Sequence, residues 1–157
     1  MKIRLALPIV LVAGFAQAAH VQSAHAASGA DLYAANCSMC HQAGGVGAPG
    51  QYPPLKNRID KIASSSEGKH YLAAVLVNGL VGRIDAGGAT YVGYMPAFKQ
   101  LPDADIAAVL TWLSAQGDSK PPPVLAAADI TTVRGQPLSS SAVAKERKAL
   151  AAVHPLP

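Results

Sequence analysis

Hydrophobic residues recur at helical spacing in three stretches of the chain. They predict a short helix at about 28–37, a second at about 67–78 and a third at about 103–116. The third pattern is the clearest, because its apolar positions share one face of a helix. These positions are Ile106, Val109, Leu110 and Leu113.

Polar and glycine residues mark the ends of these helices. Ser28 and Asp31 resemble a capping box with Asp in place of Glu. Gly79 is placed to stop the second helix. We expect Asp103 to cap the third helix and Gly117 to end it.

Other segments carry weaker patterns. Residues 83–93 contain a Gly-Gly pair between short alternating stretches, which predicts a small hairpin or a loop. Residues 121–123 are three prolines and form a stiff spacer, and 142–151 show a weak helical pattern. A C-terminal tail that lies over the domain or over a partner, and a disordered tail, both fit this pattern.

The N-terminus reads as a targeting segment. Lys2 and Arg4 precede an apolar run at 5–15, and small residues surround Ala26. We expect a signal peptide at 1–26 that is removed on export to the periplasm. The alternative is an uncleaved anchor, but the apolar run is shorter than the roughly 20 residues that span a bilayer.

The length of 157 residues suits one domain. We divide the chain into the signal peptide, a domain at 27–117 and a Pro-led basic tail at 118–157. Lys2 and Arg4 account for two of the 13 basic side chains, which leaves 11 against 9 acidic ones and gives no indication of nucleic-acid binding. Only 5% of residues are aromatic, so a large apolar cofactor would help to fill the core.

The two cysteines stand in the motif C-S-M-C-H, from Cys37 to His41. Two thiols three positions apart, followed at once by His, are typical of haem c attachment. Each sulfur would form a thioether to the haem, and the imidazole would reach the iron. The motif predicts covalent attachment at Cys37 and Cys40 and axial ligation by His41.

Three other interpretations compete. A redox-active disulfide is expected beside a strand–helix unit of thioredoxin type, and no such pattern surrounds the motif. A zinc site needs four ligands, but the part after the signal peptide holds only two Cys and His41, His70 and His154. The third interpretation is that the motif arose by chance, but the motif uses both cysteines of the chain.

The second axial position decides between an electron carrier and an open haem. Met39 lies inside the attachment motif, so Met95 is the remaining methionine after the signal peptide. Gly93 and Pro96 frame it and would hold a thioether against iron. A lone Met is more often core filler, and His70 and His154 are the other candidates.

A Gly- and Pro-rich loop at 44–55 follows the motif. A ligating His usually donates its second ring N–H to an acceptor such as a carbonyl, and Pro53 or Pro54 is the expected source. From this loop we also expect Tyr52 and Pro54 to contact the haem. The alternative is an ordinary surface turn.

Taken in order, these motifs resemble class I cytochromes c over about 28–117. They are G-A-D-L-Y-A-A-N-C-S-M-C-H, Y-P-P-L, N-G-L-V-G, G-Y-M-P-A-F and the Trp112 helix. The resemblance implies an all-α fold of three to four short helices around one covalent haem c. It also implies that Gly29 and Tyr33 cross the last helix near Trp112, and that Met95 is the distal ligand. Pro102 departs from these proteins, which often have a capping Ser there.

More loosely, the chain is similar to cytochrome subunits of periplasmic dehydrogenases. A His/Met haem has no open site, and its thioether ligand raises the reduction potential. This predicts an electron carrier rather than an enzyme, passing electrons from a periplasmic dehydrogenase to a terminal oxidase or another cytochrome, with no membrane span in the mature chain. The alternatives are a haem enzyme or gas sensor with a dissociable distal ligand, and an integral subunit that needs its tail for assembly.

Overall fold

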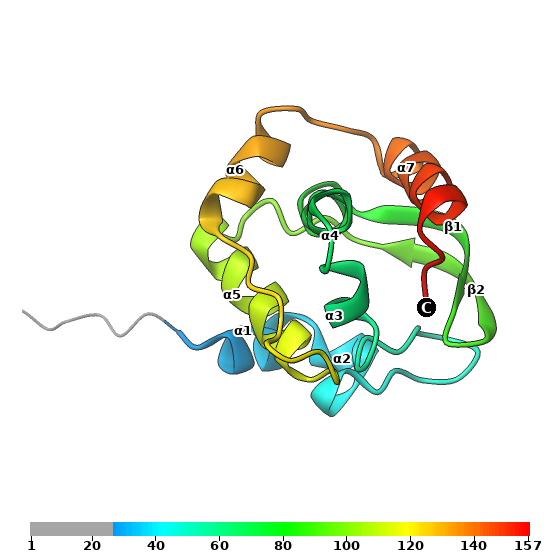
Figure 1. Ribbon diagram of the computed structural model, residues 1–157, viewed down its shortest axis with the longest axis horizontal. Coiled ribbons are helices and arrows are strands. Elements are labelled where there is room, and N and C mark those ends of the chain that lie inside the picture. The colour runs from blue at the N-terminus through cyan, green and yellow to red at the C-terminus, as the bar shows by residue number, and fades with distance from the viewer. Residues whose placement is uncertain (1–26) are drawn as a thin grey trace, which may run out of the picture.

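The computed structural model describes residues 27–157, and the expected signal peptide lies outside them. The main chain forms short helices around a central one, with a two-stranded hairpin at one side (Figure 1). The helices are α1 (Gly29–Asn36), α2 (Ser38–His41), α3 (Ile59–Ile62), α4 (Ser66–Asn78), α5 (Asp103–Ala115), α6 (Ala127–Arg134) and α7 (Ser140–Val153), and the strands are β1 (Leu80–Ala86) and β2 (Ala89–Met95). A 3-10 turn, η1 (Ala43–Gly45), follows α2.

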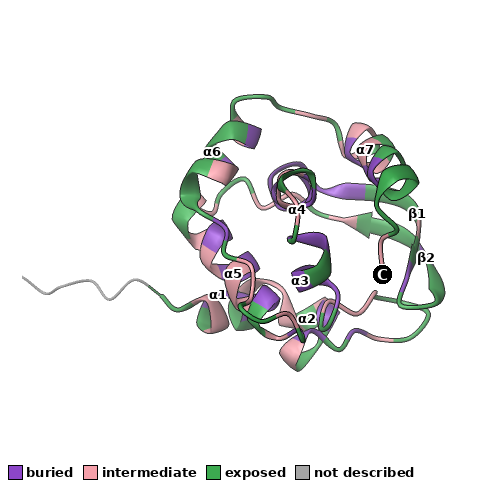
Figure 2. Cartoon of the chain, viewed as in Figure 1, coloured by how far each residue is buried: buried purple, intermediate pink, exposed green. Residues whose placement is uncertain are grey.

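The central helix is α4, and its residues are buried along most of its length (Figure 2). Ser65 caps it by accepting a hydrogen bond from the N–H of Gly68 at 3.0 Å. Gly79 ends it with a positive φ of 77°, a conformation that glycine adopts without strain. The predicted second helix is therefore confirmed.

Helices α1 and α5 cross closely, as the resemblance implied. Ser28 caps α1 by accepting from the N–H of Asp31. The rings of Tyr33 and Trp112 lie 4.7 Å apart between their centroids. Gly29 faces the backbone of α5, where a Cβ atom would lie 2.3 Å from the carbonyl oxygen of Ala108. The crossing therefore needs glycine at this position.

The expectation of an all-α fold of three to four short helices is wrong in two respects. Residues 27–157 contain seven α-helices, and β1 and β2 form an antiparallel hairpin. The register runs from Leu80 opposite Met95 to Ala86 opposite Ala89. The turn residues Gly87 and Gly88 have φ values of 57° and 77°, as a two-residue turn of the mirror-image type requires. Of the two possibilities for residues 83–93, the hairpin is the one that forms.

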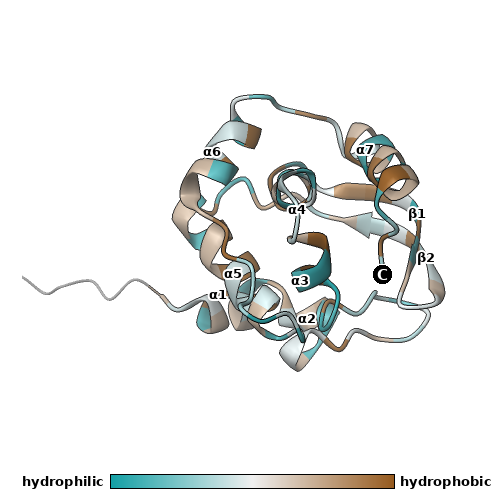
Figure 3. Ribbon diagram, in the orientation of Figure 1, coloured by the Kyte–Doolittle hydropathy of each residue, from teal (hydrophilic) through white to brown (hydrophobic). Residues whose placement is uncertain are grey.

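The tail after Gly117 lies on the domain and shares its core. Leu125, Ile130, Val133, Val143 and Leu150 are buried in the same apolar cluster as α4 and α5. Helix α7 contains the weak pattern seen at 142–151. Helix α6 was not expected from the sequence, because it is short and rich in β-branched residues. Its packing against α4 and α5 stabilises it. The helices around α4 mix hydrophobic and hydrophilic positions (Figure 3).

The start of α5 differs from the prediction that Asp103 caps it. Asp103 is the first helical residue, and Pro102 holds the cap position without a side-chain hydrogen bond. The Asp103 carboxylate instead accepts from the hydroxyl of Thr131 at 2.6 Å and from Nε of Arg134 at 2.7 Å. These two hydrogen bonds connect the start of α5 to α6.

Within residues 27–157 no helix combines the length and apolar character needed to cross a membrane.

Candidate functional site

The cysteine motif lies on the short helix α2, directly after α1. The N–H of Cys37 still bonds the carbonyl of Tyr33, and the N–H of His41 bonds the carbonyl of Cys37, both at 2.9 Å. Gln42 then takes a φ of 60°, which turns the chain out of the helix. One helical turn thus presents Cys37, Cys40 and His41 together.

Both cysteines are free and half-buried. Burial, and then the neighbouring Cys40 sulfur, raise the pKa of the Cys37 thiol to about 11. A redox-active cysteine pair has the opposite property, a lowered thiol pKa. Zinc is no better supported, because within 27–157 no three His, Cys, Asp or Glu side chains gather as metal ligands would.

His41 is 7% exposed and is oriented by one hydrogen bond. Its Nδ1 lies 2.9 Å from the carbonyl oxygen of Pro53. A carbonyl can only accept, so Nδ1 carries the proton and Nε2 keeps its lone pair. Burial lowers the pKa of His41, the Pro53 carbonyl partly opposes this, and the charge of Arg58 lowers the pKa further. The imidazole is therefore neutral, as a metal ligand must be.

Hydrogen bonds and close packing hold the loop after the motif in one conformation. The carbonyl of Gly45 accepts from the N–H groups of Leu55 and Lys56 at 2.7 and 2.9 Å. The N–H of Gly47 bonds the carbonyl of His41 at 2.9 Å, and a Cβ at Gly47 would lie 2.7 Å from the nitrogen of Pro54. This close packing fixes the carbonyl that faces His41.

Of the two expected acceptors, the structure uses Pro53. The carbonyl of Pro54 instead accepts from Nη1 of Arg58 at 2.6 Å. The ring of Tyr52 stands edge-on to His41, with 6.5 Å between the centroids. Tyr52 therefore lies beside the His41 side chain, whereas the Pro54 carbonyl accepts from Arg58.

Met95 ends β2 on the inner face of the hairpin. Side chains alternate across a strand, so Met95 shares a face with Tyr91 and, through the register, with Leu80 opposite. Leu80 and Tyr91 are buried, and Met95 packs against the core. Met39, in contrast, is 87% exposed and points away from the core.

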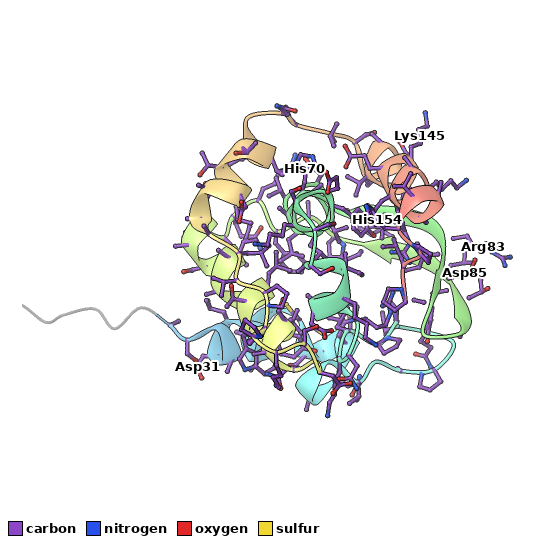
Figure 4. The ribbon with its side chains drawn as sticks, viewed as in Figure 1. Asp31, His70, Arg83, Asp85, Lys145 and His154 are labelled. Carbon is purple, nitrogen blue, oxygen red and sulfur yellow. The ribbon has the colours of Figure 1, made fainter. Side chains whose placement is uncertain are left out.

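The other distal candidates lie elsewhere. His70 stands on α4 between α6 and α7, and His154 follows α7, whereas α2 lies at the opposite side of the view (Figure 4). His70 lines a groove of about 650 Å³ together with residues of α6 and α7. The structure does not bring either histidine toward the cysteine motif.

The inner face of the hairpin leaves room for a flat group. Gly82 and Gly93 pair with each other between Met95 and Tyr91. No atom lies within 4 Å of the position that a Cβ would take at either glycine. The free thiols, the neutral His41 and this glycine pair all fit a covalently attached haem.

Comparison with known proteins agrees with this geometry. The family model for cytochrome c matches residues 26–117. This chain belongs to the cytochrome c family. It therefore binds haem c covalently and acts as an electron carrier.

Two kinds of relative stand out. Cytochrome c-552 of Thermus thermophilus is 40% identical over 128 residues, which cover 79% of this chain and 97% of that protein. The cytochrome c subunit of a quinone alcohol dehydrogenase from Gluconacetobacter polyoxogenes is 32% identical over 116 residues. That match covers 72% of this chain and 24% of the subunit.

Sequence reasoning missed two buried side chains beside this site, Arg58 and Arg147, which are 6% and 8% exposed. Arg147 stands in the charged run at 145–148, Arg58 belongs to no recognised motif, and arginine is usually exposed. No local pattern distinguishes them from surface residues. Their burial is visible only in the folded chain.

Proposed function

We propose that this protein carries single electrons in the periplasm on one haem c with His/Met axial ligation. Cys37 and Cys40 would hold the haem through thioethers, and His41 and Met95 would occupy the axial positions. The main support is the Pro53 hydrogen bond, which leaves Nε2 of His41 as the free nitrogen. The haem supplies an iron that takes up and releases one electron.

The protein's own residues have three tasks in this proposal. His41 is neutral and fixed in one tautomer, so it can ligate without a proton leaving. Met95 sits on a hairpin whose exit is anchored, since the N–H of Phe98 bonds the carbonyl of Leu76 at 2.7 Å. Two axial ligands from rigid segments leave no open coordination site and disfavour substrate binding at the metal.

The first test compares two methionine variants by visible spectroscopy of the haem-loaded protein. The oxidised wild type should show the weak far-red band that a methionine–iron bond produces. Met95→Ala should lose this band, whereas Met39→Ala, which removes an exposed methionine, should keep it. A wild-type spectrum that is high-spin and shifts with carbon monoxide would favour the enzyme or gas-sensor alternative instead.

We further propose that the donor is a periplasmic dehydrogenase and the acceptor a terminal oxidase or another cytochrome. The dehydrogenase subunit among the relatives supports the donor. The test is stopped-flow reduction of the oxidised protein by a reduced quinone-dependent alcohol dehydrogenase. Rapid saturating reduction is expected, and reduction no faster than by free quinol would exclude this donor.

A further inference from the structure

A groove lies between helices α4, α6 and α7. Helices α6 and α7 each pack against α4 but make few contacts with each other, so a space of about 650 Å³ stays open between them. In Figure 1 α2, which carries the cysteine motif, lies at the opposite side of the view from these three helices. The volume falls within the range of about 300–1,000 Å³ that small-molecule sites have.

One wall of the groove is apolar. Ala149, Leu150 and Val153 of α7 line it, together with the Tyr71 side chain of α4. Leu150 belongs to the buried core, whereas Val153 is 70% exposed. This wall therefore offers apolar surface that the hydrocarbon part of a ligand would remove from water.

The charged side chains of the groove are acidic. Glu67 of α4, Asp129 of α6 and Glu146 of α7 line it with His70, and within the described part of the chain no lysine or arginine does. The contrast with the surrounding segment is clear, because residues 118–157 hold five basic side chains and three acidic ones. Two of those three acids face the groove. The groove is therefore complementary to a cation.

Glu146 is the carboxylate that most clearly lacks a partner. Its side chain is half-buried, and its Oε2 atom is shielded from solvent without a hydrogen-bond partner among residues 27–157. The adjacent Arg147 donates instead to the hydroxyl of Tyr71 and to the carbonyl of Asp85. Leaving a carboxylate without a donor or a counter-charge is unfavourable. Because both oxygens share the negative charge, a cation in the groove beside Glu146 would compensate it.

The arrangement favours an organic cation over a metal ion. Among residues 27–157 no three His, Cys, Asp or Glu side chains are grouped closely enough to hold a metal. A metal ion would also gain nothing from the apolar wall. A positively charged nitrogen on a hydrocarbon chain uses both features, since its N–H groups donate to a carboxylate and its chain covers the α7 wall.

We propose that this groove binds an aliphatic ammonium ion, with the charged nitrogen at Glu146 and the hydrocarbon chain along Ala149 and Val153. The site goes beyond electron transfer and shares no residue with the proposed haem site. Two of its three helices, α6 and α7, lie outside the residues that the family model matches. The ligand is a free amine, and the lysine side chain of another protein is the competing source of the same group.

The experiment titrates the reduced, haem-loaded protein with hexylammonium at neutral pH and constant ionic strength. Proton NMR follows the imidazole resonances of His70, which lines the groove, and a His70→Gln variant assigns them. A saturating shift with a dissociation constant of about 1–10 mM is expected for a ligand of this size. Hexanoate has the same chain with the opposite charge, and hexanol has no charge, so both should bind at least about fivefold more weakly.

Three variants separate the contributions of charge and shape. Glu146→Gln should weaken hexylammonium binding at least about fivefold. Asp118→Asn is the matched control, because it makes the same change at an exposed position that does not line the groove, and its dissociation constant should stay within about twofold of the wild-type value. Ala149→Phe fills the groove from an exposed position of α7, so it should abolish binding while the protein stays folded.

Several results would overturn the proposal. Equal affinities of Glu146→Gln and Asp118→Asn would do so, as would hexanoate or hexanol binding as tightly as hexylammonium. If Glu146→Gln does not fold, unchanged binding in Ala149→Phe is decisive by itself. A shift of the His70 resonances by a helical peptide of leucine and lysine, with none by hexylammonium, would mean that the groove docks a protein segment and takes up no free amine.

Discussion

Replacing Gly29 by Ala tests the close crossing that places the cysteine motif. A Cβ there would lie 2.3 Å from the carbonyl oxygen of Ala108 and 2.8 Å from Cβ of Trp112, so α1 and α5 must separate. Overpacking of this kind costs about 1–3 kcal/mol, and weakening the Tyr33–Trp112 contact adds about 0.5–1.5 kcal/mol. The better helix propensity of Ala returns at most about 1 kcal/mol.

The expected net loss for Gly29→Ala is about 2 kcal/mol, or roughly 8 °C in Tm for a domain of this size. The assay is guanidinium unfolding of the haem-loaded protein, followed by circular dichroism and by the fluorescence of Trp112, which is the single tryptophan of the chain. Gly135→Ala is the control, because a Cβ there would have ordinary contacts at 3.5 Å or more and φ is −70°.

The free energy of unfolding of the Gly135→Ala control should lie within about 0.5 kcal/mol of the wild-type value or slightly above it. If the free energy of unfolding of Gly29→Ala lies within 0.5 kcal/mol of the wild-type value, the helices can separate at little cost. The argument for close packing at this crossing is then wrong.

Three further changes test other parts of the structure. Ser119→Ala removes a 2.7 Å hydrogen bond to the buried Asp60 carboxylate and should cost about 1–2 kcal/mol in urea unfolding. Burial raises the pKa of Asp60, but the hydrogen bonds from Ser119 and the backbone lower it below its usual value. This contribution to stability should therefore be present above pH about 4 and lost as pH falls further. Arg134→Ala frees the loop after Met95, where Arg134 bonds the carbonyls of residues 99 and 101 at 3.0 and 2.9 Å, so the far-red band should disappear at a lower temperature than in the wild type. Tyr33→Phe removes the 2.6 Å bond to the carbonyl of Gln42 and should cost about 1 kcal/mol, and burial, which raises the pKa of Tyr33 to about 12, should keep this phenol protonated in an alkaline titration.

Local signals in the sequence account for the features that were predicted correctly. A cap at Ser28, a stop at Gly79 and the apolar face of α5 depend on neighbouring residues, so they can be recognised without the fold. The same holds for the cysteine motif, whose spacing is set by one turn of helix. Ligation by Met95 stays a prediction, and the sequence singles this residue out because few methionines compete with it.

The hairpin shows where local signals were insufficient. Its inner positions include Gly82 and Gly93, so the alternation of apolar and polar side chains that marks a strand is interrupted. On the outer face Val92 and Tyr94 are 75% and 66% exposed, which obscures the pattern further. The glycines that hide the strands are the ones that leave space beside Met95.

The burial of Arg58 and Arg147 depends on contacts that are distant in sequence. Arg147 donates to the carbonyl of Asp85, 62 positions away, and Arg58 donates to the main-chain oxygen of Pro157, 99 positions away. Helix α6 has a similar origin, because burial of Ile130 and Val133 compensates for its weak helix propensity. Such elements follow from tertiary packing and carry no recognisable motif.

The shared core changes how the C-terminal segment bears on function. Ile130, Val133 and Val143 are at most 1% exposed and pack within this chain, so they are not available to anchor a catalytic partner. Deleting residues 118–157 would remove part of the core, together with Arg147 and the Pro157 oxygen that accepts from Arg58. Loss of partner binding after such a deletion would therefore not identify a docking tail. A test of docking therefore has to change exposed side chains one at a time. Met39, at 87% exposure beside the attachment cysteines, is the first to change, because replacing it leaves the core, the arginines and both proposed axial ligands in place.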